Sequence, residues 1–128
     1  MEEQNWYEIP ITIPDEFRDW VSNNIPSDQV SSIPESHITL LYGFDPKFYN
    51  EIDQTVKMYN ITSKDYTFGD PRKGDISPVW LLPIKSPKLE ELFWILYSKF
   101  PNQHTLINGK YDPHVTLCWI KSPDKNQE

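Results

Sequence analysis

His37-Ile38-Thr39-Leu40 recurs near the end of the chain as His114-Val115-Thr116-Leu117. Each stretch follows a loop and alternates apolar and polar side chains, a pattern that predicts a half-buried β-strand. Because strand side chains alternate between two faces, each histidine shares a face with the threonine two positions later. The apolar residues between them, together with Tyr42 and Trp119, are expected to point the other way and to cover helices.

The segments around these tetrapeptides repeat the order strand, helix, strand. Each helix opens with a proline, which suits the first turn of a helix, and each second strand carries one His-x-Thr pair. Two copies are too few for a solenoid. We therefore predict an α+β domain with a pseudo-two-fold axis and with the histidine strands near its centre. The predicted elements are strand 6–12, a helix from 14 to about 24, strand 36–42, strand 79–84, a helix from 87 to about 99, and strand 114–120.

Between the repeats, Asp45-Pro46 is predicted to begin another helix, whose apolar side chains recur at helical spacing. A short strand is expected within 64–69, and residues 70–75 are expected to form a turn-rich loop. A chain of 128 residues suits one domain, which we place at 1–121, followed by a polar C-terminal tail over 122–128.

Composition and charge favour a protein that binds small ligands. The chain is 38% hydrophobic and 14% aromatic, which supplies material for a core, and its net charge is -7. That charge argues against duplex DNA or structured RNA as a partner, although a local pocket can still hold a small nucleotide. A lone cysteine, Cys118, cannot form an intrachain disulfide, and the N-terminus does not resemble a signal peptide. We expect a cytoplasmic monomer with no membrane contact.

The two His-x-Thr pairs would place two imidazoles and two hydroxyls around one site. Imidazole has the unperturbed pKa closest to neutrality, so one histidine can act as a base while the other acts as an acid. Threonine hydroxyls can donate hydrogen bonds to the oxygens of a phosphate. The three histidines lack the spacing of a metal site, so no metal or other cofactor is expected. The predicted catalytic residues are His37, Thr39, His114 and Thr116.

The paired tetrapeptides resemble the twin signature motifs of the 2H phosphoesterase superfamily. The resemblance extends over nearly the whole chain, and it implies the 2H (LigT-like) fold: two pseudo-symmetric strand-helix-strand lobes with antiparallel sheets around a central cleft. It also implies that His37 and His114 are the acid–base pair and that Thr39 and Thr116 hold the phosphate. The compact chain is most similar to viral and phage members, among them anti-CBASS enzymes that cleave cyclic oligonucleotide signals.

Three functions are compatible with this resemblance. The first is a metal-independent phosphodiesterase that cleaves small cyclic or 2′,5′- or 3′,5′-linked oligonucleotides, in evasion of nucleotide-signalled immunity within a host cytoplasm. The second is an enzyme that opens 2′,3′-cyclic phosphates at RNA ends, which the acidic composition disfavours. The third is a non-catalytic sponge for nucleotides, which two intact motifs disfavour.

Other residues are candidates for binding the substrate outside the phosphate. Two adjacent cations in the 70–75 loop could meet a second phosphate, and several aromatic rings could stack on a base. His104 lies in a polar loop without a threonine partner and is expected at the surface. Cys118, expected on the His114 face, is interpreted as a small buried thiol. The substrate-binding candidates are Tyr111, Arg72, Lys73, Trp6, Tyr7 and Trp80.

Overall fold

The computed structural model describes residues 4–74, 78–104, 106 and 109–121, so the predicted tail over 122–128 lies outside the described residues. Short 3-10 helices lie at Ser27–Gln29, Pro46–Phe48 and Ser63–Asp65. The remaining elements are, in order, β1 (Trp6–Pro10), α1 (Asp15–Asn24), β2 (Val30–Ser32), β3 (His37–Tyr42), α2 (Tyr49–Tyr59), β4 (Thr67–Phe68), β5 (Arg72–Lys73), β6 (Val79–Lys85), α3 (Pro87–Lys99) and β7 (His114–Ile120).

Local sequence signals explain where the helices begin. Ser86 caps α3 by accepting a hydrogen bond from the N–H of Leu89, and Pro87 occupies the first helical position. Asp45 accepts from the N–H of Lys47 ahead of α2. The predicted helices and the predicted long strands are confirmed within a few residues. The prediction of a loop over 70–75 is wrong in part, because Arg72 and Lys73 pair with β6 as the short strand β5.

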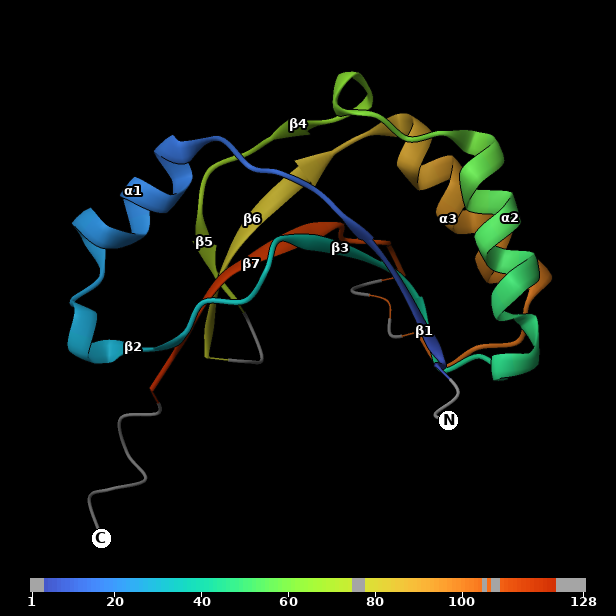
Figure 1. The fold of residues 1–128 in the computed structure, drawn as a ribbon, viewed down its shortest axis with the longest axis horizontal. Coiled ribbons are helices and arrows are strands. Elements are labelled where there is room, and N and C mark those ends of the chain that lie inside the picture. Colours follow the sequence, from blue (N-terminus) through green and yellow to red (C-terminus); the bar gives the residue numbers. More distant parts are fainter. Residues whose placement is uncertain (1–3, 75–77, 105, 107–108, 122–128) are drawn as a thin grey trace, which may run out of the picture.

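Antiparallel strands form two sheets, which confirms the predicted α+β class. β1 pairs with β3 in the first sheet, and the second sheet has the order β2-β7-β6-β4, with β5 also paired to β6. β3 and β7 are in contact although no ladder of hydrogen bonds joins them. They run side by side in roughly opposite directions across the middle of the molecule (Figure 1). The two predicted His-x-Thr strands therefore meet at the junction of the sheets.

The helices are exchanged between the two repeats. α1 follows β1 in the chain but packs against β7, and its Trp20 ring lies 5.0 Å from that of Trp80 on β6. α3 follows β6 but packs against β3, and α2 packs against both β1 and α3. Figure 1 shows α1 at one end of the arch of strands and α2 and α3 at the other. Each histidine strand is thus covered by the helix of the other repeat, and the predicted pair of pseudo-symmetric lobes around a central cleft stays a prediction.

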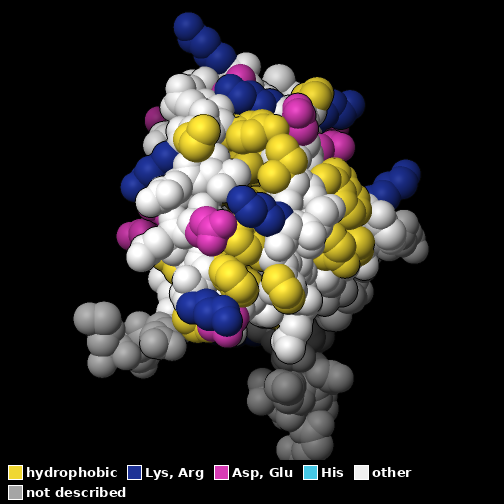
Figure 2. All heavy atoms as spheres, turned by 90° about the vertical axis from the view of Figure 1, so that its right-hand side faces the viewer, with side chains coloured by type: hydrophobic (Ala, Val, Ile, Leu, Met, Phe, Trp, Pro, Cys, Tyr) yellow, Lys and Arg dark blue, Asp and Glu magenta, His cyan; other side chains and the backbone are white. Residues whose placement is uncertain are grey.

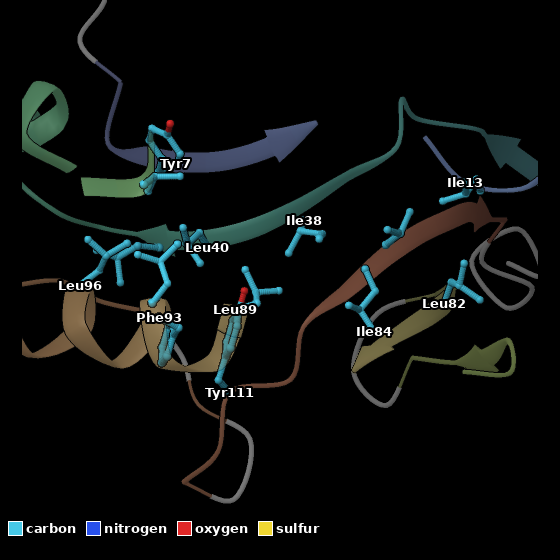
Figure 3. Packing of buried hydrophobic residues seen from close by; sticks show 14 of the residues in the cluster. Tyr7, Ile13, Ile38, Leu40, Leu82, Ile84, Leu89, Phe93, Leu96 and Tyr111 are labelled. Carbon is cyan, nitrogen blue, oxygen red and sulfur yellow. The ribbon is translucent and has the colours of Figure 1, made fainter. Parts of the chain in front are cut away.

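The core lies between the sheets and these helices. Ile38 and Leu40 on β3 are fully buried against Leu89, Phe93 and Leu96 of α3 (Figure 3). A buried apolar side chain contributes about 1.5–3 kcal/mol to stability, so this layer fixes β3 firmly.

The opposite side of α2 and α3 carries apolar and charged side chains interspersed (Figure 2). Within the described residues, no helix combines the length and the hydropathy needed to cross a membrane.

Candidate active site

A β-bulge follows the threonine in both histidine strands. In β3, Glu8 pairs with Thr39 and Tyr7 with Leu41, so Leu40 is an extra residue. In β7, Leu81 pairs with Thr116 and Trp80 with Cys118, so Leu117 is the extra residue. The two strands consequently share one burial pattern, in which the histidine and threonine are half-buried and the next two residues after the threonine are buried.

The bulges correct the predicted orientation of the residues that follow. An extra residue shifts the alternation by one position. Leu41 and Cys118 therefore point into the core, where both are fully buried. Tyr42 and Trp119 return to the face of the His-x-Thr pairs and are 42% and 40% exposed. The expectation that Tyr42 and Trp119 cover helices was wrong, as was the expectation that Cys118 shares a face with His114.

Both imidazoles are held in the same way. Nδ1 of His37 lies 3.0 Å from the carbonyl oxygen of Glu35, and Nδ1 of His114 lies 2.8 Å from that of Asp112. A carbonyl oxygen only accepts hydrogen bonds, so Nδ1 must carry the proton in each neutral ring. Nε2 is then the atom with a free lone pair. In both histidines Nε2 is the nitrogen available for exchanging a proton with a ligand.

The backbone that enters each histidine is fixed in the same way. Proline stands opposite the histidine in each ladder, Pro10 against His37 and Pro83 against His114. The residue after the proline donates its N–H to the carbonyl just before the histidine. These bonds join Ile11 to Ser36 at 3.1 Å and Ile84 to Pro113 at 3.0 Å. The duplication thus extends to the hydrogen bonds that set the direction of each ring.

Glu8 distinguishes the first histidine from the second. Its carboxylate lies 3.6 Å from Nε2 of His37, and both side chains are partly exposed. The contact is an ion pair only when His37 is protonated. The equivalent position in the second sheet is Leu81, opposite Thr116. Glu8 could not be recognised from the sequence, because only the pairing of β1 with β3 reveals that this residue faces the site.

Arg72 supports the loop that holds His114. Its guanidinium pairs with the carboxylate of Asp112, whose carbonyl oxygen accepts from His114. The two side chains are each 37% exposed. Arg72 therefore lies near the site, but its contact is to the protein itself. Lys73 is exposed and, as the next residue of β5, points to the opposite face of the strand.

Tyr111 connects the two motifs from within the core. It is 9% exposed, it stacks on Phe93 with ring centroids 3.9 Å apart, and its hydroxyl donates to the carbonyl oxygen of Thr39 at 2.7 Å (Figure 3). Burial chiefly, with the charges of Asp112 and Glu90, raises the pKa of Tyr111, so the hydroxyl remains a donor. The prediction that Tyr111 stacks on a base is corrected, because Phe93 already covers its ring.

The other aromatic candidates separate into one exposed ring and two packed rings. Tyr7 is 7% exposed, and its hydroxyl donates to Asp53 of α2 at 2.6 Å. Burial raises the pKa of Tyr7, and the hydrogen bond to Asp53 raises it further. Trp80 packs on Trp20 of α1. These two predictions are corrected, since both rings belong to the helix side. Trp6, 43% exposed, pairs with Tyr42 and so shares its face.

His104 lies close to the site instead of at the open surface. Its ring is half-buried, with centroids 5.7 Å from Tyr42, 5.1 Å from Phe93 and 5.9 Å from Tyr111. Its Nδ1 atom is buried without a hydrogen-bond partner among the described residues. Burial, and secondly the charge of His114, lower the pKa of His104. The predicted surface role is therefore wrong, because the loop folds back over the end of β3.

Gly43 allows this close approach. Gln103 donates its N–H to the carbonyl oxygen of Tyr42, and a Cβ atom on Gly43 would lie 2.5 Å from that of Gln103. Gly43 also has φ +78°, a conformation that favours glycine. The strand end and the His104 loop therefore fit together only with glycine at this position.

In the described part of the chain, no group of three or more His, Cys, Asp or Glu side chains is arranged to hold a metal ion. A separate cavity lies between the end of β1 and the 3-10 helix at Ser63–Asp65, with Pro10, Thr12 and Tyr66 in its wall.

Comparison with protein-family models, with curated proteins and with solved structures finds no match. The assignment of a function therefore depends on the geometry of the site and on the resemblance of its motifs.

Proposed function

We propose that the chain is a metal-independent phosphodiesterase of the 2H type, with His37 and His114 as its acid–base pair. The observation that carries the proposal is the duplicated hydrogen bond from Nδ1 to the carbonyl two residues before each histidine. It leaves both Nε2 atoms for proton transfer on the face that carries Thr39 and Thr116. The substrates are small cyclic or 2′,5′- or 3′,5′-linked oligonucleotides.

The reaction requires two proton transfers and one bound phosphate. The hydroxyls of Thr39 and Thr116 donate to the non-bridging oxygens and hold the phosphorus between the strands. Nε2 of one histidine removes a proton from a 2′-hydroxyl or a water molecule as its oxygen attacks phosphorus. Nε2 of the other histidine gives a proton to the oxygen that leaves. The net charge of the two imidazoles is therefore the same before and after the step.

Glu8 supports a division of roles within the pair. A carboxylate 3.6 Å from Nε2 pairs with an imidazolium, which is the form that a general acid requires. We therefore assign the acid role to His37 and the base role to His114. Asp112 presents its carbonyl to His114 and directs its carboxylate to Arg72, so no carboxylate is described next to Nε2 of His114.

The motif resemblance also suggests the setting of this activity. Compact viral and phage phosphodiesterases of this type destroy nucleotide signals of host immunity, and we propose that role, as a cytoplasmic monomer in the host. A chain with a net charge of -7 suits a short nucleotide held at a local site better than a long RNA.

The test is incubation with a panel of substrates in the presence of EDTA. The panel contains 2′,3′-cyclic nucleotides, 2′,5′-oligoadenylate, and cyclic di- and trinucleotides, with products separated by chromatography. We expect cleavage of at least one cyclic or linked oligonucleotide by the wild type and none by a variant that combines His37→Ala with His114→Ala. Preference for 2′,3′-cyclic ends would favour the RNA-end activity. Release of every ligand unchanged would contradict catalysis and favour the sponge.

A further inference from the structure

The bulges at Leu40 and Leu117 bring one exposed aromatic ring to the catalytic face of each strand. Tyr42 follows its bulge by two residues, and so does Trp119, so the two rings occupy equivalent positions in the repeats. They are 42% and 40% exposed. A shift of one residue in either strand would bury the ring and expose its neighbour, so the bulge is what makes the ring accessible.

Exposed aromatics concentrate on this face. In the described part of the chain, the exposed large aromatic side chains are Trp6, Tyr42, Trp94 and Trp119. Trp94 belongs to α3, whereas Trp6 pairs with Tyr42 across the first sheet. Single exposed apolar residues are common in proteins. Two at equivalent positions beside two equivalent His-x-Thr pairs form a pattern that chance exposure does not explain.

The rings lie on opposite sides of the phosphate site. Counted along the partner strands, each ring is two residues beyond its threonine, which corresponds to about 7 Å. Because β3 and β7 run in roughly opposite directions, their far ends lie on opposite sides of the junction (Figure 1). Tyr42, at the end of β3, is therefore on the side of His114, which begins β7. Trp119 is on the other side.

We propose that Tyr42 and Trp119 stack the two nucleobases that flank the scissile phosphate. The substrate class is then an internucleotide phosphodiester with a base on each side. This inference rests on the proposed function and adds an orientation to it. The nucleoside whose 2′-hydroxyl attacks lies beside the base His114 and stacks on Tyr42. The nucleoside whose oxygen leaves with a proton from His37 stacks on Trp119.

The experiment compares Tyr42→Ala and Trp119→Ala on two substrates, with Trp94→Ala as the matched control. The substrates are a 3′,5′-linked diadenosine monophosphate and adenosine 2′,3′-cyclic phosphate, which has only the base on the Tyr42 side. On the first substrate, each site variant should raise KM by roughly fivefold to a hundredfold, the usual effect of one base–aromatic stack. On the second, Tyr42→Ala alone should raise KM. In Tyr42→Phe and Trp119→Phe, the KM for both substrates should return to near the wild-type value.

Unchanged KM values in both site variants, or equal changes in Trp94→Ala, would overturn the inference. The reverse pattern on the cyclic substrate would overturn the orientation. Binding of the dinucleoside to the variant with both histidines replaced by alanine separates this inference from the proposed function. If the wild type bound the dinucleoside through Tyr42 and Trp119 but did not cleave it, this result would reject catalysis and support the stacking sites. Absence of binding would reject the stacking sites.

Discussion

The histidine strands β3 and β7 agree in their backbone and differ in the side chains around them. Both have a proline opposite the histidine, a bulge after the threonine and an Nδ1 bond to the carbonyl two residues before the ring. Around β3 the added groups are Glu8, beside His37, and Arg18, which donates to Ser36 at 3.1 Å. Around β7 they are Arg72 and Tyr111, which hold the loop before His114.

This difference separates the features that both histidine strands share from the features that only one of them has. Ring direction and the threonine hydroxyls are duplicated, so they are set by the backbone and by the His-x-Thr pattern. Among the described residues, a charge beside Nε2 occurs only in the first sheet, as Glu8, where the second sheet has Leu81. An acid and a base need the same placement but opposite protonation. We infer that the repeat supplies the placement and that the unique side chains supply the division of roles.

The largest expected effect comes from removing either imidazole. His37→Ala and His114→Ala should each lower kcat by about a hundredfold or more, because positioned proton transfer contributes 10²–10⁴ to a rate. The combined variant should be little worse than either single one, since both groups serve the same transition state. Steady-state kinetics on the best substrate of the panel measures this. Near-wild-type turnover by a folded single variant would refute the symmetric pair.

The threonines should follow with a smaller loss. Thr39→Val and Thr116→Val each remove one hydroxyl bond to a charged oxygen and should cost roughly 10- to 100-fold in kcat/KM, from about 1.5–3 kcal/mol per bond. Similar losses in the two variants would support equivalent donors. Thr39→Ser and Thr116→Ser keep the hydroxyl and serve as controls. If serine and valine were equally damaging, the role of the threonine would be packing.

Glu8→Gln tests the point at which the two repeats differ. A partly exposed ion pair contributes about 0–1 kcal/mol, so turnover should fall by no more than about fivefold. Steady-state kinetics on the best substrate of the panel measures this loss. Glu35→Gln is the matched control, because Glu35 contacts His37 through its carbonyl oxygen only. Equal losses in Glu8→Gln and Glu35→Gln would remove the basis for giving the two histidines different roles.

Much of this arrangement could be predicted from the sequence, because it depends on local patterns. The His-x-Thr alternation, the helix-starting prolines and Ser86 are each determined by neighbours in the chain, and all led to correct elements. The bulges could not be predicted in this way. Leu40-Leu41 and Leu117-Cys118 are apolar pairs that suit a regular strand as well as a bulged one, and only the partner strand decides between them.

Long-range contacts account for the other errors. Tyr111 and His104 stand in a polar loop, and their burial results from the packing of α3 across the repeat boundary onto β3. No local signal shows that a helix will cover the sheet of the other repeat. Glu8 resembles any polar residue of an edge strand until its register places it opposite Thr39. Membership in the 2H family stays a prediction from the motifs.

Tyr111→Phe probes the link between the repeats. It removes the bond to the carbonyl oxygen of Thr39 and keeps the stacking on Phe93. We expect the free energy of unfolding to fall by about 1–2 kcal/mol, because a part-buried carbonyl loses its donor. Urea unfolding measures this, with Tyr97→Phe on α3 as the control. A loss confined to kcat, with unchanged stability, would assign the hydroxyl to the reaction.

The smallest expected effect is the contribution of His104 to the pH dependence of stability. Burial first and the charge of His114 second lower the pKa of His104 from its ordinary 6.5. Well above pH 6.5 the residue is neutral in the folded and the unfolded chain and contributes no difference. As the pH falls below 6.5, the unfolded chain gains a proton that the folded chain resists, so the free energy of unfolding declines.

His104→Gln should remove this part of the decline. Urea unfolding of both proteins at pH 8 and pH 5 isolates it, since the rest of the chain is the same in the two proteins. The stability of the variant relative to the wild type should improve at pH 5. A difference that is the same at both pH values would mean that His104 accepts a proton as readily in the fold as outside it, and the third histidine would then belong to the solvent and not to the site.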